Sequence, residues 1–153
     1  MVIDASVAVK WFVKDEADAD LADDMLVALL AGDLELHAPR IFTYEVCAVL
    51  TKACSQRSVS AKSPRLTKEL ALRCAREVFR LPIRHASADV NEATDSVRMA
   101  IECSKTFNDM TYVCLAGALD CHWCTADDKL LRNVPSGFPR DRILLLASLR
   151  QSP

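Results

Sequence analysis

Hydrophobic and polar residues repeat along this chain at two periods, and the two periods predict strands that alternate with helices. Short, wholly apolar runs predict buried strands, because a strand covered on both faces carries no polar side. Such runs lie at Val2–Ile3 and 143–146, and three short segments of mixed composition, 34–38, 83–84 and 122–125, are also expected to be strands. Apolar residues at helical spacing predict helices over 6–13, 16–31, 41–54, 64–78, 89–105, 109–119 and 127–133.

This alternation favours an α/β fold in which helices cover both faces of a parallel sheet. A length of 153 residues suggests a single domain, and we find no composition shift or repeat that marks a boundary. The polar segment 55–63 predicts a loop. In sheets of this kind, ligands bind where the carboxyl ends of the strands meet, so functional residues are expected at that edge.

Composition argues against a membrane or secreted protein. The longest apolar stretch, Met110 to Leu119, is well short of the roughly 20 residues that a bilayer span needs. The N-terminus lacks a basic region and a cleavage site, so no signal peptide is expected. Seven cysteines, an odd number set mostly in apolar segments, indicate free thiols. We therefore expect a cytoplasmic protein.

A net charge of −2 argues against a protein that coats nucleic acid by charge alone. It remains compatible with an enzyme that meets nucleic acid through bound cations. Most acidic residues need no special function. One group is interpreted as the solvated face of the helix at 16–31, and it comprises Asp15, Glu16, Asp18, Asp20, Asp23 and Asp24.

Four other carboxylates stand out because each is set in apolar sequence. Asp4 ends the first predicted strand, and Asp127 follows the strand at 122–125. Glu45 lies near the start of the most apolar helix, and Asp109 opens another apolar helix. A buried carboxylate without a partner is costly, so each needs a cation, a hydrogen-bond donor or water.

Three of these acids occupy positions that converge at the carboxyl edge of a parallel sheet, since Asp4 and Asp127 follow strands and Asp109 begins a helix. Several carboxylates in one cleft repel one another, so their convergence implies a divalent cation. Ligation by oxygen alone suits Mg²⁺ or Mn²⁺ better than Zn²⁺. The same positions also suit helix caps or solvated strand ends, and the spacing is compatible with either role.

The motifs around these acids resemble a known family. The first twelve residues, MVIDASVAVKWF, resemble the opening of a PIN domain, especially that of VapC-type toxins of bacteria and archaea. The segment YEVCAVL around Glu45 resembles the second motif, and DMTYVCLA from Asp109 resembles the third. The segment TADDKLL from Thr125 resembles the fourth. The motifs follow the family's order and spacing over nearly the whole chain.

The resemblance implies a single PIN domain over 1–153, a PIN-like three-layer α/β/α sandwich with a central, mostly parallel sheet of about five strands. It also implies a metal-dependent endoribonuclease that hydrolyses RNA phosphodiester bonds with one or two Mg²⁺ or Mn²⁺ ions. The metal-ligating and catalytic acids would be Asp4, Glu45, Asp109 and Asp127. Ser6 and Thr125 match hydroxyl positions beside the acids and would orient a carboxylate or a water molecule.

Partners follow from the same resemblance. It implies the toxin of a VapBC-type toxin–antitoxin pair, with a cognate VapB-like antitoxin, a homodimer and an RNA substrate such as tRNA or rRNA. No membrane partner is expected. The sequence departs from the family at Asn108, where an aromatic residue usually precedes the third acid; here Phe107 lies one position earlier.

Three alternatives stay open. A catalytically inactive PIN domain would act as an RNA- or protein-binding module. A phosphatase of the haloacid dehalogenase type would use Asp4 as nucleophile, but it would place a second aspartate at the position of Ser6. The pair Cys121 and Cys124 forms a C-x-x-C, which we interpret as packing because a redox motif opens a helix and a zinc site needs more ligands.

Overall fold

A computed structural model describes residues 1–55, 64–87 and 89–151. Its centre is a parallel sheet of five strands in the order β3-β2-β1-β4-β5. The strands are β1 (Val2–Ile3), β2 (His37–Ala38), β3 (Arg84–His85), β4 (Trp123–Thr125) and β5 (Ile143–Leu145). The predicted α/β class and the parallel sheet are confirmed.

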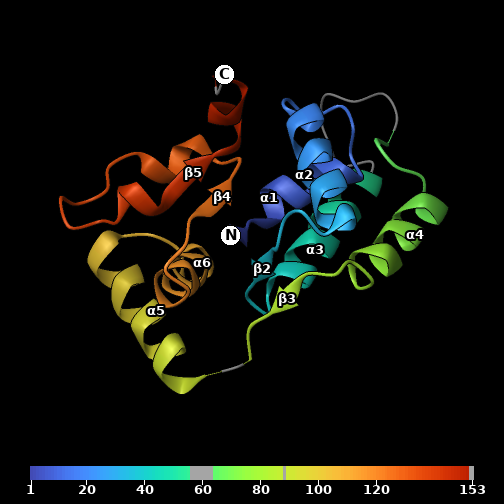
Figure 1. Ribbon diagram of the computed structural model, residues 1–153. Coiled ribbons are helices and arrows are strands. Elements are labelled where there is room, and N and C mark those ends of the chain that lie inside the picture. Colours follow the sequence, from blue (N-terminus) through green and yellow to red (C-terminus); the bar gives the residue numbers. More distant parts are fainter. Residues whose placement is uncertain (56–63, 88, 152–153) are drawn as a thin grey trace.

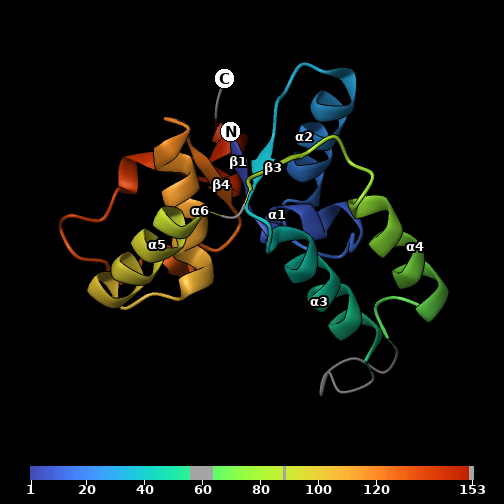
Figure 2. The same cartoon turned by 90° about the horizontal axis from the view of Figure 1, so that it is seen from below.

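Helices lie on both sides of this sheet, as the two perpendicular views show (Figures 1 and 2). On one side lie α1 (Ala5–Ala8), α2 (Ala19–Ala31), α3 (Phe42–Cys54) and α4 (Lys68–Val78). On the other lie α5 (Val90–Cys103) and α6 (Phe107–Ala118). Short 3₁₀ turns complete the chain: η1 (Val9–Trp11), η2 (Asp128–Leu131), η3 (Arg140–Arg142) and η4 (Leu146–Gln151).

The strand order explains the two layers. The chain steps outward from β1 through β2 to β3 and then returns to form β4 on the other side of β1. Right-handed crossovers in opposite directions place their helices on opposite faces of the sheet. The central strands are therefore covered on both faces, and Val2, Ile3 and Cys124 are fully buried.

Several helix boundaries differ from the sequence expectation, and side-chain caps explain two of them. Helix α4 begins at Lys68 rather than at Pro64, because the Thr67 side chain accepts a hydrogen bond from the Leu70 N–H at 3.2 Å. Helix α6 begins at Phe107, two residues before Asp109, because Thr106 caps it. Asp109 thus lies in the first turn of the helix.

The start of α2 differs for another reason. Asp18 adopts a left-handed conformation with φ of 57°, which breaks the predicted helix, so α2 begins at Ala19. The predicted strand at 34–38 is reduced to its last two residues, His37–Ala38. Most of the predicted loop at 55–63 lies outside the described residues, which end at Ser55 and resume at Pro64.

Two composition-based expectations can be compared with the structure. All seven cysteines are free thiols, as predicted. Cys124 is buried in β4, and burial together with the negative charge of Asp4 raises the pKa of its thiol to about 12. A thiolate is therefore disfavoured there, which supports the packing interpretation of the C-x-x-C. No helix in the described ranges combines the length and apolar character needed to cross a bilayer.

Candidate active site

Asp4 lies at the carboxyl end of the central strand, where the sheet ends and a helix begins. Its backbone N–H donates to the Cys124 carbonyl at 2.9 Å, which extends the pairing of β1 with β4. Its Oδ1 accepts from the Ser6 N–H at 2.7 Å and caps α1. The local sequence thus folds so that this carboxylate points beyond the sheet edge, held by the first turn of α1.

The surroundings of Asp4 disfavour the negative charge of its carboxylate. Burial raises its pKa from 3.8 to about 6, although hydrogen bonds from Ser6 oppose the change. The negative charge of Glu45 raises that pKa further, so the two carboxylates are near enough to repel each other. Repulsion of this kind is relieved by protonation or by a cation.

Glu45 lies in the first turns of α3, and both of its oxygens are held by donors from α6. Oε1 accepts from the Asn108 side-chain amide at 2.8 Å, and Oε2 accepts from the Tyr112 hydroxyl at 2.5 Å. The Tyr112 ring stacks on Trp123 of β4 with centroids 5.5 Å apart. Helices from opposite faces of the sheet therefore fix this carboxylate at their shared edge.

Tyr112 acts as a hydrogen-bond donor because it remains protonated. Burial and the charges of Asp4 and Glu45 raise the pKa of its hydroxyl far above the ordinary value of 10. A phenol in that state donates its proton to a carboxylate without transferring it. The residue therefore orients Glu45 rather than serving as a base.

Ser6 and Thr125 join the first and fourth motifs. Their hydroxyl oxygens lie 3.4 Å apart, although the residues are 119 positions apart in sequence. Ser6 Oγ accepts from the Ala126 N–H at 3.0 Å, and Thr125 Oγ1 accepts from the Asp127 N–H at 3.1 Å. These two hydroxyls therefore stabilise the backbone conformation at Ala126 and Asp127.

Asp109 and Asp127 lie at the same edge but in looser positions. Asp127 is exposed, and its Oδ1 accepts from the Lys129 N–H at 2.9 Å, which caps η2. Asp109 is partly buried in the first turn of α6. Across the described ranges, no three His, Cys, Asp or Glu side chains are grouped closely enough to hold one metal ion. The structure thus brings Asp4 and Glu45 together and leaves the other two acids outside that pair.

The donors at this edge nevertheless have the chemistry that a hard divalent cation requires. They are carboxylate oxygens with neighbouring hydroxyls, and no cysteine or histidine ligand is among them. Within the described part of the chain, none of the four acids forms an ion pair with lysine or arginine. Their negative charge is left for a ligand from outside the chain to balance.

The family follows from comparison of the sequence with family models. The model of the PIN domain matches residues 1–135. The chain belongs to the PIN domain family. No curated protein matches its sequence.

Solved structures share the fold of this PIN domain at low sequence identity. VapC20 of Mycobacterium tuberculosis, a toxin that cleaves the sarcin–ricin loop, is 14% identical, with a TM-score of 0.60 and coverage of 83% of this chain and 89% of the toxin. A toxin–antitoxin complex from Klebsiella pneumoniae is 15% identical, with a TM-score of 0.60 and coverage of 95% and 96%. VapBC2 of Rickettsia felis, bound to a promoter DNA fragment, is 15% identical, with a TM-score of 0.61 and coverage of 94% and 96%.

Two residues of the PIN domain site were not predicted from the sequence. Asn108 is noticeable there only as a departure from the family pattern, yet its side chain binds Glu45. Tyr112 belongs to the third motif, and its spacing of three residues from Asp109 is the signal for a shared helix face. That it contacts Glu45 depends on how α3 and α6 meet, which the spacing does not reveal.

A cleft opens beside the acids of the PIN domain. It has a volume of about 460 Å³ and is lined by Ser6, Lys10, Asp127 and Lys129, among others. The Lys10 ammonium is largely buried, donates to the Ala17 carbonyl at 2.9 Å and lies 3.7 Å from Glu16. The cleft is therefore lined by two lysines and by three acids, Glu16, Asp127 and Asp128, and Glu16 balances the charge of Lys10.

Proposed function

We propose that this PIN domain is a Mg²⁺- or Mn²⁺-dependent endoribonuclease, the toxin of a VapBC-type toxin–antitoxin pair. One observation carries the proposal. At the position of the family's acids, Asp4 and Glu45 repel each other, and in the described part of the chain neither has a cationic partner. Two carboxylates that repel each other without a cation do not stabilise the fold, so the pair is best explained by chemistry.

Asp4 and Glu45 would hold the first metal ion, with Asp109 and Asp127 as further ligands from α6 and the loop after β4. A bound divalent ion supplies a water molecule of lowered pKa and positive charge for the reacting phosphate. The neighbouring residues of the chain orient the carboxylates of Asp4 and Glu45. The Ser6 backbone N–H donates to the Asp4 carboxylate, and Asn108 and Tyr112 each donate to one oxygen of Glu45.

The hydroxyls of Ser6 and Thr125 complete this arrangement. They accept hydrogen bonds from the backbone N–H groups of Ala126 and Asp127 and lie next to Asp4, so they connect the segments that carry the two acids. Lys10 and Lys129 line the adjacent cleft together with Glu16, Asp127 and Asp128, so a phosphate backbone there would be favoured by bound cations as well as by the lysines. The substrate is therefore proposed to enter along that cleft.

The proposed partners are a VapB-like antitoxin and a second copy of this chain. Support comes from the solved complexes of the same fold, which are a toxin–antitoxin complex and a VapBC assembly on DNA. A cytoplasmic location is proposed with them, since the RNA substrate is found there.

Cleavage of end-labelled total RNA tests the proposal. Purified protein is incubated with Mg²⁺, Mn²⁺ or EDTA, and the Asp109→Asn variant controls for contaminating nucleases. We expect discrete products that need a divalent cation and are absent with the variant. Identical products from both proteins would refute the assignment.

A second measurement covers the case in which no RNA is cut. Metal-binding calorimetry then separates a nuclease whose target is absent from the RNA pool from a binding module that never uses metal. Absence of Mn²⁺ binding by the wild-type protein would favour the inactive PIN domain.

A further inference from the structure

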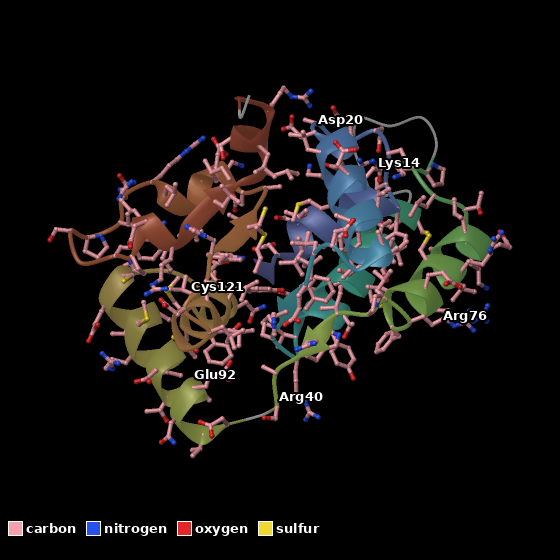
Figure 3. All side chains as sticks on the ribbon, in the orientation of Figure 1. Lys14, Asp20, Arg40, Arg76, Glu92 and Cys121 are labelled. Atoms are coloured by element: carbon pink, nitrogen blue, oxygen red, sulfur yellow. The ribbon has the colours of Figure 1, made fainter. Side chains whose placement is uncertain are left out.

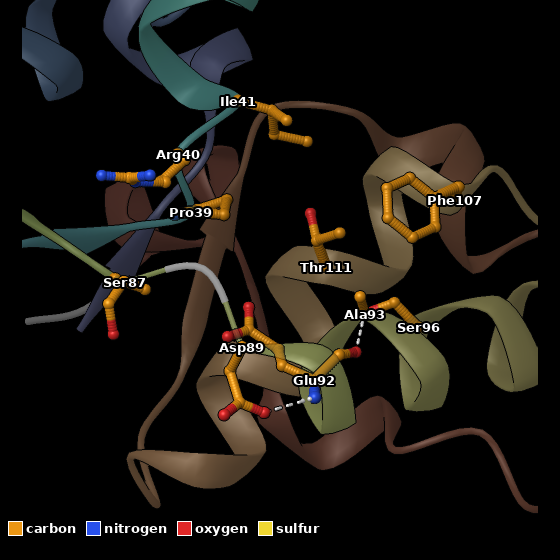
Figure 4. Close-up of a pocket in the computed structure, with 11 residues that line it drawn as sticks. Pro39, Arg40, Ile41, Ser87, Asp89, Glu92, Ala93, Ser96, Phe107 and Thr111 are labelled. Atoms are coloured by element: carbon orange, nitrogen blue, oxygen red, sulfur yellow. Dashed lines mark hydrogen bonds between the residues drawn. The ribbon is translucent and has the colours of Figure 1, made fainter.

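A second pocket lies beside the acids, on the side of α5. It has a volume of about 160 Å³, and its walls include Pro39, Ile41, Phe107 and Thr111, with Glu92 of α5 below (Figure 4). Ile41 immediately precedes α3, and its carbonyl accepts the Glu45 N–H at 2.9 Å. The pocket is thus built from the same helix starts that carry the candidate catalytic residues.

Hydrogen bonds connect the pocket to the acids within one helical turn. Thr111, in the pocket wall, donates its hydroxyl to the Asn108 carbonyl at 2.7 Å. The Asn108 side chain in turn binds Glu45. A nucleotide whose phosphate lies at the acids therefore has its base, or that of its neighbour, within reach of this pocket.

The partly or fully buried polar side chains of the pocket differ in whether they already have a partner. The hydroxyls of Thr111 and Ser96 both donate to backbone carbonyls, Ser96 to that of Glu92 at 2.8 Å. The Glu92 carboxylate is only partly exposed, and in the described ranges it forms neither a hydrogen bond nor an ion pair. Burial and the charge of Asp89 raise its pKa. A complementary ligand must therefore donate hydrogen bonds.

Arg40 does not neutralise this carboxylate. Its side chain extends out of the pocket and away from Glu92 in the close-up (Figure 4), and Figure 3 shows where both residues lie on the whole molecule. The remaining walls are largely apolar. A flat apolar group with one donor edge matches this lining.

The size of the pocket restricts the ligand further. A protein cavity of about 150 Å³ accommodates one benzene ring. A pocket of about 160 Å³ therefore admits a single six-membered ring, and the second ring of a purine would project from it.

We propose that this pocket binds one cytosine base of the RNA substrate, with the cytosine N4 amino group donating to the Glu92 carboxylate. Carboxylates are the side chains that accept from this amino group in nucleic-acid recognition. Uracil presents a carbonyl oxygen at the same place, which the carboxylate repels. The inference rests on the proposed ribonuclease activity, for which Glu92 is a specificity-determining residue.

Nuclear magnetic resonance titration tests the pocket without any cleavage. Isotope-labelled protein is titrated with cytidine 5′-monophosphate and with uridine 5′-monophosphate. We expect the amide signals of Ala93 and Thr111 to shift with the cytidine nucleotide, at a dissociation constant about tenfold lower than with uridine. Equal affinities, or no shift at these amides, would overturn the proposal.

Two matched variants sharpen the result. Glu92→Gln replaces the carboxylate by an amide that both donates and accepts, so the preference for cytidine should disappear. Glu102→Gln removes the same charge from an exposed position of the same helix and should keep the preference. An unchanged preference in Glu92→Gln would refute the role of this residue. Arginine methyl ester is titrated as a guanidinium probe, and its binding without nucleotide binding would also overturn the proposal, in favour of a cationic protein side chain.

Sequencing the ends cut from a randomised RNA pool separates this inference from the proposed function. Cleavage with cytosine enriched beside the cut, and lost in Glu92→Gln, supports both. Cleavage without that enrichment refutes the pocket and leaves the nuclease standing. If no RNA is cut, metal-binding calorimetry decides the nuclease proposal, and the nucleotide titration decides separately whether the pocket binds cytosine.

Discussion

The molecule contains two acid-rich regions that differ in how their charge is balanced. Before and at the start of α2, Arg65 pairs with Asp15 and with Glu16 at 2.6 Å, and Arg150 pairs with Asp18 at 3.0 Å and Asp20 at 2.8 Å. At the carboxyl edge of the sheet, Asp4 and Glu45 share one site without such a partner in the described part of the chain.

The pKa of aspartate is therefore shifted in opposite directions in the two regions. Hydrogen bonds and charge from the arginines hold the pKa of Asp15 and Asp20 below the usual value of 3.8. Burial raises the pKa of Asp4 to about 6. Where the chain needs acids for structure it provides the cation itself, and where it leaves them unpaired the cation is expected from solution.

The largest effect we predict is on catalysis. Asp4→Asn removes one of the two neighbouring carboxylates and should lower the rate of RNA cleavage by at least about 100-fold, because the proposed metal ion loses a carboxylate ligand. Asp20→Asn, in the compensated region, should cleave at the wild-type rate. Rates on the same labelled RNA, with circular dichroism to confirm folding, provide the measurement. Full activity of Asp4→Asn would remove this residue from the mechanism.

The next effect is on stability and its pH dependence in metal-free protein. Between pH 4 and 6 folded Asp4 keeps a proton that the unfolded carboxyl has lost, so unfolding releases a proton. The free energy of unfolding should therefore fall as pH rises through this window, by up to about 3 kcal/mol. Urea unfolding in EDTA at pH 4, 5, 6 and 7 measures it. Asp4→Asn should flatten the slope, and an equal slope in the variant would assign it to other groups.

Binding of a divalent metal ion should have a smaller effect, on the melting temperature. Millimolar Mn²⁺ should raise the melting temperature of the wild-type protein by about 5 °C or more, through preferential binding to the folded state. Asp4→Asn should lose this shift, whereas Arg65→Met should retain it. Superimposable wild-type melting curves with Mn²⁺ and with EDTA would contradict a metal site at the sheet edge.

The smallest effect belongs to the compensated region. Arg65→Met should lower the melting temperature by at most about 4 °C, because exposed ion pairs contribute little to stability. The difference from wild type should shrink in 1 M NaCl, which screens such pairs. Calorimetry at low and high salt tests this, and a difference that persists in salt would indicate lost packing instead.

The sequence predicted the parts of this comparison that depend on local order. Asp4 after an apolar run and Asp109 at a helix start were recognised because strand ends and helix starts leave a local pattern. The acids before and at the start of α2 were interpreted as a solvated face, and their ion pairs were not predicted because Arg65 is about 50 positions away and Arg150 about 130.

Contacts between helices escaped prediction for the same reason. Glu45 is held by Asn108 and Tyr112, which lie 63 and 67 positions further along the chain. Hydrophobic periodicity gives the face of a helix that is buried, but not the side chain that another helix brings to it. The Glu92 pocket, formed where α5, α6 and the start of α3 meet, has no sequence signal of its own.

The contact between Ser6 and Thr125 has a consequence for synthesis of the protein. It joins the segment that follows the first strand to the end of the fourth across 119 positions, and the pairing of Val2 in β1 with Trp123 in β4 spans a similar interval. A growing chain on the ribosome must therefore wait for four-fifths of its length before these two strands meet. Until then Asp4 has no partner across the sheet, and the nascent polypeptide carries the acids without the arrangement that makes them a site.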